Sequence, residues 1–465
     1  MSAPSQKETE VKSSEKVVRK YNSPQWPETI PESWTWSRVD WVGEEVRHTI
    51  NPTSLEYEEV FHYSIPTIEE TGDGSFEDPQ TIKSKKLLID GGEVLVSKLN
   101  PGKSRVITAS SYSPITLASS EFIPLKTYED DILNEYLEFV LKSEPVRQYL
   151  EGIATSATRS HQRVSPAEIR QLNFPLPPLS TQRSLLSYLD HHTARIDAVL
   201  EMKQKTLCHL EEKKEALITR AVTLGLDQTV ATKETDVEVL GEIPEHWEPV
   251  RLKYLLNKIE QGWSPKCEDR PSKPEEWGVL KAGAAKNGRF IESENKKLPS
   301  DETPQTEYKV KEGDLLMNRA SGSPDLVGNV ALVHKPSQKL LLCDKLFRLH
   351  VREDVAIPEF LFFALRSHAA RHQIIGSISG AEGLANNIPQ ADVKELSLAL
   401  PPLSEQKSIA EEVFDCEAQI DSLTRKIMEI IGVLNEKRQA LITAVVTGQL
   451  DLSDWEGQED QELLA

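Results

Sequence analysis

The sequence is poor in cysteine, in aromatic residues and in long apolar runs. Its four cysteines, among 465 residues, lie far apart and form no Cys-x-x-Cys pair, which argues against a disulfide framework and a zinc site. No apolar stretch is long enough to cross a membrane, and the polar first residues do not resemble a signal peptide. We therefore expect a soluble protein of a reducing, cytoplasmic compartment, with two to four domains.

Positive charge is also in short supply, since the net charge is −20, which at first argues against a nucleic-acid partner. The distribution is uneven, however. Residues 451–465 hold six acids and no base, whereas residues 83–105 hold six bases against two acids and residues 281–297 five against two. Because an acidic surface can also serve a protein partner, the total charge does not decide between these classes.

Signatures of covalent chemistry are missing as well. Pro-Gly-Lys-Ser at 101–104 lacks the first glycine of a phosphate-binding loop, because Ser97 stands there. His368 and His372 have the spacing of two zinc ligands, but Ala369 replaces the glutamate of a metalloprotease motif, so solvated histidines are expected. There is no nuclease carboxylate cluster, no Ser/His/Asp arrangement and no Asn/Asp-Pro-Pro-aromatic loop of amino-methyltransferases. We expect no catalytic residue, cofactor or metal on this chain.

What the sequence does contain is an internal repeat. Residues 172–227 and 396–451 align without a gap, and 22 of the 56 pairs are identical, including a shared Pro-Pro-Leu-Ser-x-Gln. Weaker sequence similarity relates residues 30–39 to 243–252 and residues 92–98 to 313–319. The chain is therefore a tandem duplication of a globular segment followed by a helix.

The repeat places the domain boundaries. We expect a disordered extension at 1–24, globular domains at 25–178 and 233–402, helical segments at 179–232 and 403–450, and an acidic tail at 451–465. The globular domains read as mixed α/β, with short apolar runs between Gly, Pro, Ser and Asn clusters and a helix at 132–150 and at 358–375.

Each repeat predicts a long helix. The Pro-Pro pair favours an extended start, Ser180 and Ser404 are expected as N-caps, and Gly225 and Gly448 lie where a left-handed C-terminal residue is useful. Apolar positions follow in heptad spacing, which predicts that the two helices pair, either parallel or antiparallel. The predicted pairing residues are Leu189, Ile196, Val199, Leu210, Leu217, Val413, Ile420, Leu423, Ile427, Leu434 and Leu441.

Polar loops at matching positions are the candidate binding residues. They carry arginine, asparagine and glutamine, the side chains that read base edges in a major groove, although asparagine and glycine also simply make turns. The candidates for DNA contact are Lys98, Lys103, Arg105, Thr158, Arg159, Ser160, His161, Gln162, Arg163, Asn318, Arg319, Ser321, Ser323, Asn386, Asn387 and Gln390.

The duplicated Pro-Leu-Ser-x-Gln motif, the long helix ending in Ala-Leu-Ile-Thr and the polar loop before it resemble the specificity subunit of bacterial type I restriction-modification enzymes. The resemblance covers about residues 25–450. It implies an α+β protein with two target-recognition domains, separated by two helices packed as an antiparallel coiled coil with pseudo-twofold symmetry. Each domain would read one half of a bipartite double-stranded DNA site.

The resemblance also implies partners. Two modification (methyltransferase) subunits would dock around the helices and use S-adenosylmethionine, and restriction subunits would use ATP and Mg²⁺ for translocation and cleavage. A helix of roughly 65 Å corresponds to about nineteen base pairs, enough for two half-sites with unread bases between them. The alternative is a coiled-coil scaffold that joins two protein-binding modules, which the acidic balance favours.

Overall fold

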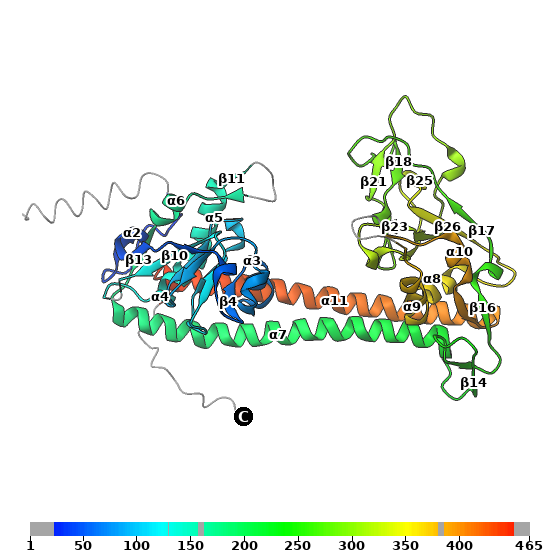
Figure 1. Ribbon diagram of the computed structural model, residues 1–465, viewed down its shortest axis with the longest axis horizontal. Coiled ribbons are helices and arrows are strands. Elements are labelled where there is room, and N and C mark those ends of the chain that lie inside the picture. The colour runs from blue at the N-terminus through cyan, green and yellow to red at the C-terminus, as the bar shows by residue number, and fades with distance from the viewer. Residues whose placement is uncertain (1–22, 129, 157–161, 380–385, 451–465) are drawn as a thin grey trace, which may run out of the picture. The chain divides into compact units, whose positions relative to one another are not determined.

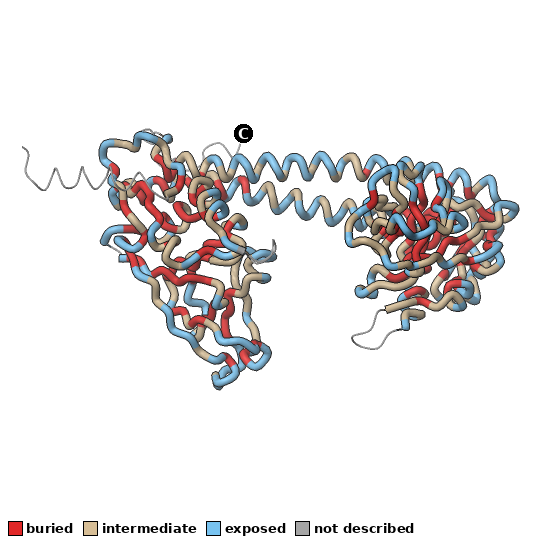
Figure 2. The backbone as a smooth tube through the Cα atoms, turned by 90° about the horizontal axis from the view of Figure 1, so that it is seen from above, coloured by how far each residue is buried: buried red, intermediate tan, exposed pale blue. Residues whose placement is uncertain are grey.

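The chain divides into two compact units (Figure 1). The computed structural model describes residues 23–128, 130–156, 162–379 and 386–450. The first unit comprises Met1–Lys203 with Glu429–Ala465, and the second comprises Gln204–Met428. Each unit thus holds one globular domain, whose interior gathers the buried residues (Figure 2), and a part of each long helix. The expected extension at 1–24 lies outside the described residues except for its last two, and the acidic tail lies outside them entirely.

The two globular domains share a four-stranded antiparallel sheet. Its order is β2-β10-β7-β8 in the first unit and β17-β26-β22-β24 in the second. The apolar runs predicted as strands form its centre, because their side chains are buried on both faces. The strands are β2 (Gly43–Glu45), β7 (Val94–Ser97), β8 (Val106–Thr108), β10 (Phe122–Thr127), β17 (Leu256–Gln261), β22 (Leu315–Asn318), β24 (Val330–Leu332) and β26 (Leu346–Val351).

A two-stranded antiparallel ladder closes each domain. In the first unit β1 (Thr35–Arg38) pairs with β13 (Asn173–Leu176), and in the second β16 (Glu248–Arg251) pairs with β28 (Ser397–Leu400). These ladders join the start of each domain to the strand before its long helix. The short similar segment near the start of each copy therefore marks the same structural element.

The helix predicted in each domain is in fact two helices. The first unit has α4 (Asn134–Lys142) and α5 (Glu144–Ile153), and the second has α8 (Pro358–Arg366) and α9 (His368–Gly376). The break falls at Ser143 and Ser367, whose backbones are extended. Each serine hydroxyl donates to a carbonyl of the preceding turn, at 2.6 Å and 2.7 Å. The single-helix prediction was wrong because helical periodicity of the apolar residues continues across this break.

The second sheet differs between the copies. The first unit has the five-stranded order β3-β6-β9-β4-β5, and the second has the three-stranded order β21-β18-β25. The strands are β3 (His48–Ile50), β4 (Val60–Tyr63), β5 (Ser75–Glu77), β6 (Lys86–Ile89), β9 (Thr116–Ala118), β18 (Trp277–Leu280), β21 (Asn295–Lys297) and β25 (Lys339–Leu341). Each sheet has its own apolar core, so the domains share a framework but not this part.

Short elements complete the domains. The helices are α2 (Val39–Val42), α3 (Ile65–Thr71), α6 (Pro166–Arg170) and α10 (Gln390–Glu395). The further strand pairs are β11 (Thr155–Ser156) with β12 (Gln162–Arg163), β14 (Thr232–Glu234) with β15 (Glu242–Pro244), β19 (Ala285–Lys286) with β20 (Arg289–Phe290), and β23 (Ala320–Ser321) with β27 (Asn386–Asn387).

The two long helices, α7 (Leu179–Leu224) and α11 (Leu403–Val446), are antiparallel in each unit. In the first unit Leu189 near the start of α7 shares a core with Val445 near the end of α11. In the second unit Ile218 near the end of α7 shares a core with Val413 near the start of α11. The predicted α+β fold with an antiparallel helix pair is confirmed.

Matching ion pairs cross between the helices. Asp197 and Asp421 occupy equivalent positions in the repeat, as do Arg438 and Lys214. Arg438 Nε lies 2.9 Å from Asp197 Oδ1 in the first unit, and Lys214 Nζ lies 3.9 Å from Asp421 Oδ1 in the second. The duplicated aspartate thus faces a base of the other helix in both copies.

The predicted pairing residues do not all lie in the seam. Leu189, Ile196, Val413 and Ile420 are buried. Half-buried side chains are those of Val199, Leu210, Leu217, Ile427, Leu434 and Leu441. Leu423 is 48% exposed, so its assignment was wrong. The seam passes through half-buried Thr424 between Ile420 and Ile427, and Leu423 turns out of it.

The starts of the long helices also differ from expectation. Each helix begins at the leucine before the predicted serine cap, and the backbone N–H groups of Gln182 and Gln406 bond to the carbonyls of Pro178 and Pro402. These prolines are therefore the N-caps, and Ser180 lies in the first turn.

The ends agree with expectation, because Gly225 and Gly448 have φ values of 78° and 69°. A Cβ on Gly225 would meet the ring of Trp247 at 3.3 Å, and one on Gly448 would meet the ring of Trp34 at 3.4 Å. Each glycine thus ends a long helix against a tryptophan of the similar segments 30–39 and 243–252. The helix ends are anchored to the domains in the same way in both units.

Candidate nucleic-acid interface

In the first unit the two predicted loops lie side by side. The loop after β7 and the β11–β12 hairpin are joined by backbone hydrogen bonds, from Asn100 N to Gln162 O at 2.8 Å and from Val164 N to Lys98 O at 3.0 Å. The Asn100 side chain accepts from Gln162 N at 3.0 Å. Segments about sixty residues apart in sequence thus form one polar edge beyond the central strand of the shared sheet.

The second unit repeats this arrangement. The loop after β22 contributes β23, which pairs with β27 so that Ser321 faces Asn386 and Ala320 faces Asn387. The amide of Asn386 donates to Gly322 O at 3.3 Å, and Ile388 N donates to Arg319 O at 3.0 Å. The structure therefore brings both predicted loop pairs together, each at the same place on the shared sheet.

Three candidates for DNA contact point into the domain. Arg105 is 8% exposed and donates to Glu69 and to Leu99 O. Asn318 is fully buried, with its amide 2.8 Å from Ala282 O. The amide of Gln390 donates to Ile259 O at 2.8 Å. These hydrogen bonds hold the loops, and composition did not show which way the side chains point, so the assignment of these residues as DNA contacts stays a prediction.

Other basic candidates on the first unit are ion-paired. Lys103 Nζ lies 2.6 Å from Glu69 Oε1, and Arg163 lies 3.0 Å from Glu121. The hydrogen bond from Lys103, aided by Arg105, lowers the pKa of the Glu69 carboxyl, and the hydrogen bond that Arg163 donates to Glu121 raises the pKa of Arg163. A DNA phosphate would have to compete with these carboxylates.

The remaining candidates divide into three groups. Lys98 Nζ donates to Ser120 O at 2.7 Å, and Arg319 donates to Asp344 O at 3.3 Å, so both cations contact backbone carbonyls. Gln162, Ser321, Ser323, Asn386 and Asn387 remain partly accessible at the loop edges. Thr158, Arg159, Ser160 and His161 lie outside the described residues.

The β19–β20 hairpin of the second unit was not predicted from the sequence. Its central residues, Asn287 and Gly288, both have positive φ, at 50° and 72°. Asn-Gly is the strongest short hairpin signal because both positions of a type I′ turn need positive φ. The flanking Lys286 and Arg289 belong to the basic stretch at 281–297, so composition and turn chemistry together could have found it.

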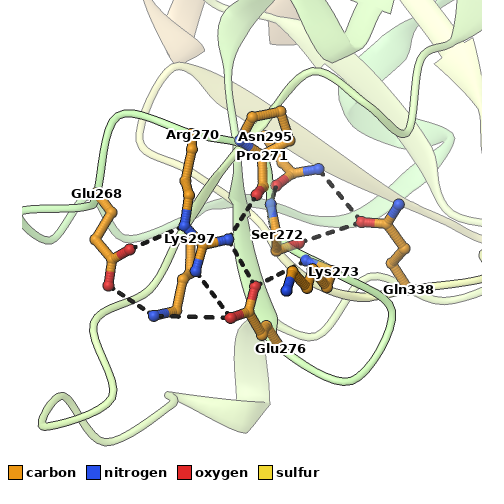
Figure 3. Close-up of polar contacts among 9 residues, drawn as sticks. All are labelled: Glu268, Arg270, Pro271, Ser272, Lys273, Glu276, Asn295, Lys297 and Gln338. Carbon is orange, nitrogen blue, oxygen red and sulfur yellow. Dashed lines mark hydrogen bonds and ion pairs between the residues drawn. The ribbon is translucent and has the colours of Figure 1, made fainter.

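A polar network supports the smaller sheet of the second unit (Figure 3). Arg270 makes two hydrogen bonds of 2.9 Å to the Glu276 carboxylate, whose Oε2 also accepts from Lys273 N. Lys297 on β21 lies 2.6 Å from Glu268. The bond from Arg270, followed by that from Lys273 N, lowers the pKa of Glu276 to about 2. The network ties the loop at 268–276 to the edge of the sheet.

This network predicts a pH dependence. Because the pKa of Glu276 is lowered from 4.5 to about 2, its stabilising effect is present above pH 4.5 and is lost as the pH falls through about 2. Substitution Glu276→Gln should therefore speed amide hydrogen exchange in β18 and β21 at pH 6, and this difference from the native chain should shrink progressively below pH 4.5. A difference that is the same at every pH would contradict the assignment.

Among the residues at 23–128, 130–156, 162–379 and 386–450, no group of three or more His, Cys, Asp or Glu could hold a metal ion. None of the helices described has the length and apolar character needed to cross a membrane.

His368 begins α9, and its backbone N–H donates to Thr219 Oγ1 of α7 at 3.1 Å, as Glu144 N does to Thr443 Oγ1 at 3.2 Å in the first unit.

The fold defines a class of protein built by duplication, in which two recognition domains share a framework and each is followed by one long helix. Residues 244–431 match the family described as the type I restriction modification DNA specificity domain. Over 194 residues the chain is 32% identical to the EcoEI type I restriction enzyme specificity subunit of Escherichia coli, a match that spans 42% of this chain and 32% of that subunit.

A longer match agrees with it. The chain is 23% identical over 441 residues to the EcoKI specificity subunit of Escherichia coli strain K12, with 90% of each chain covered. A solved structure concerned with complex assembly and conformational transition of the type I R-M system contains a chain of similar fold, with a TM-score of 0.62, 18% identity, and coverage of 91% of this chain and 100% of that one. The chain is thus similar to type I restriction enzyme specificity subunits along most of its length, and its second half matches their family model.

Proposed function

We propose that this chain is the DNA sequence-recognition subunit of a type I restriction-modification complex and has no catalytic activity of its own. Each globular domain reads one half of a bipartite site in double-stranded DNA through its paired loops. The helices α7 and α11, of 46 and 44 residues and thus roughly 65–70 Å long, set the spacing between the half-sites.

The observation that carries the proposal is the contrast between a repeated framework and unequal loops. Both domains place two polar loops at the same edge of the same sheet. The side chains there differ, with Gln162 and Arg163 in one domain and Ser321, Asn386 and Asn387 in the other. Two edges of this kind suit the recognition of two different short sequences, because amide and guanidinium groups distinguish base pairs in the major groove.

The repeated helices suit two copies of one partner. Equivalent contacts fix the helices to each domain, which offers two similar surfaces for two modification subunits. Methylation by S-adenosylmethionine would take place on those subunits. ATP-dependent translocation and Mg²⁺-dependent cleavage would take place on restriction subunits of the full complex.

Selection from a random duplex library tests the function. The chain, co-expressed with its modification subunits, should enrich a sequence with two short specified blocks separated by a fixed number of unspecified base pairs. Sequencing of methylated positions in cellular DNA should give the same two blocks. Enrichment of no sequence would contradict DNA recognition and favour the scaffold that joins two protein-binding modules, and methyl transfer by the purified chain alone would contradict the absence of catalysis.

A further inference from the structure

A polar cleft of about 790 Å³ lies in the second unit, apart from the β23–β27 pair that carries the candidate DNA contacts. Its walls come from the β19–β20 hairpin, α7, α8, α9 and the far part of the loop after β22, which includes η7 (Pro324–Leu326). Five cations and three carboxylates line it, namely Lys214, Lys286, Arg289, Arg366 and Arg371 against Glu211, Glu215 and Asp325. Three of these cations are ion-paired, Arg366 with Glu417, Arg289 with Asp421 and Lys214 with Glu211, so the cations that form no salt bridge among the described residues are Lys286 and Arg371.

The hairpin is held in place by its tip. Asn287 N donates to Asn329 Oδ1 at 3.1 Å. A Cβ on Gly288 would lie 2.7 Å from the guanidinium carbon of Arg366, so the tip packs directly against α8. Arg289 pairs with Asp421 at 2.8 Å, whereas exposed Lys286 makes no ion pair with the described residues. The anchored hairpin thus presents one uncompensated lysine to the cleft.

Arg371 provides a second uncompensated cation. Its guanidinium is half-buried and donates to three backbone carbonyls of the loop after β22. These are the carbonyls of Pro324 at 3.2 Å, of Asp325 at 2.9 Å and of Val327. Among the residues that the structure describes, no carboxylate forms a salt bridge with it. The Asp325 carboxylate acts on this cation through space but forms no salt bridge with it, so the guanidinium can still attract a nearby anion.

The first unit contains an arginine that can be compared with Arg371. Arg147 is the repeat equivalent of Arg371, and it likewise donates to a carbonyl of the loop after β7, Gly102 O, at 3.5 Å. Arg147 is neutralised, however, by Glu144 at 2.8 Å and by Glu151 at 3.7 Å. In the second unit these acids are replaced by His368 and Ile375. The arginine that contacts this loop therefore forms salt bridges in the first unit and, among the described residues, none in the second.

We propose that this cleft binds a phosphate group of the DNA backbone next to the half-site read by the second domain, through Arg371 and Lys286. Proximity favours DNA over an acidic peptide, because Asp325, Gly328 and Asn329 in the cleft wall belong to the same loop as the reading residue Ser321. Non-specific backbone contacts position a protein on the duplex while base contacts read it. The inference rests on the proposed function, and the second domain supplies this contact while the first does not.

The repeat suggests a sharp test. Substitution Ile375→Glu, at a side chain that is 56% exposed, copies Glu151 and places a carboxylate four residues from Arg371 on α9. It should place a carboxylate close to the arginine, and Arg147 keeps a contact of 3.5 Å with its loop although two carboxylates lie beside it. For the full chain with its modification subunits, we expect DNA affinity to fall about threefold to tenfold and the slope of log K against log salt to fall by about one.

The control is Ile375→Gln, because glutamine has nearly the same shape as glutamate but no charge. This variant should bind DNA as the native chain does. Lys286→Ala should reproduce the loss, and Lys335→Ala, at an exposed lysine outside the cleft, should not. Binding is measured with the duplex from the library selection and with a mixed-sequence duplex. The preferred sequence should not change in any variant.

The outcomes separate the two proposals. Equal affinity and equal salt slope for Ile375→Glu and Ile375→Gln would overturn the phosphate site while leaving sequence recognition intact. Loss of modification-subunit binding in Ile375→Glu, but not in Ile375→Gln, would show that the cleft takes an acidic protein segment and would also overturn it. A native complex that prefers no sequence would refute the proposed function, and the mixed-sequence duplex would still decide the phosphate contact.

Discussion

Replacement of Gln406 by alanine should destabilise the second unit by about 2–5 kcal/mol, since buried polar groups that lose their partners cost about 1–3 kcal/mol each. Gln406 is fully buried. Its Oε1 accepts from Ile357 N at 3.0 Å, and its Nε2 donates to Val355 O at 3.0 Å and to Pro401 O at 2.9 Å. One side chain thus fixes the long helix to the start of α8, and urea unfolding should detect its loss.

The repeat provides a second case of this anchor, and an exposed glutamine of α11 provides the control. Gln182 makes the same three contacts in the first unit, with Leu133 N, Asp131 O and Pro177 O, so Gln182→Ala should have a similar cost. Gln419→Ala changes an exposed residue of α11 and should cost little. Amide exchange at Ile357 should accelerate in Gln406→Ala alone. A cost for Gln406→Ala no greater than that for Gln419→Ala would contradict the proposed anchoring role.

The largest change in specificity should follow from exchanging a whole domain. If residues 25–175 are replaced by the corresponding domain of another specificity subunit, the first half-site should change completely while the second half-site and the spacing stay the same. Each mismatched base pair costs about 1–3 kcal/mol, so three mismatches should disfavour the old half-site by roughly a hundredfold or more. The measurement is the map of methylated positions in cells that express the hybrid with its partners.

Because the exchanged segment ends before Pro177, the hybrid keeps Pro177, Pro178 and Gln182. The Gln182 side chain can therefore form its hydrogen bonds to the new domain. Exchange of the second domain alone, residues 233–400, is the matched control and should change the other half-site. A change of both half-sites by either hybrid would contradict independent reading by the two domains. A change of spacing alone would assign the effect to the helices instead.

The sequence predicted the features that come from repetition and periodicity. The tandem organisation and the paired long helices follow from the gapless repeat and its heptads, and the two loop pairs follow from their equivalent positions. Leu423 shows the limit of this reasoning, because a leucine at near-heptad spacing still turns out of the seam. Periodicity fixes a helical face only to within tens of degrees.

The direction of polar side chains could not be predicted in the same way. Arg105 and Asn318 have the composition of DNA contacts, yet each bonds to groups inside its own domain. The second sheets also escaped prediction, since the two copies no longer align there and their short strands pair over long sequence distances. Such pairings depend on tertiary packing rather than on local sequence.

The helix pair has a further consequence for how the protein behaves on dilution. Val445 meets its apolar neighbours on α7 within a single polypeptide, as Ile218 does on α11. The association is therefore intramolecular, and its effective concentration is set by the chain itself rather than by the amount of protein in the cell. Dilution of the protein should therefore not separate the paired helices.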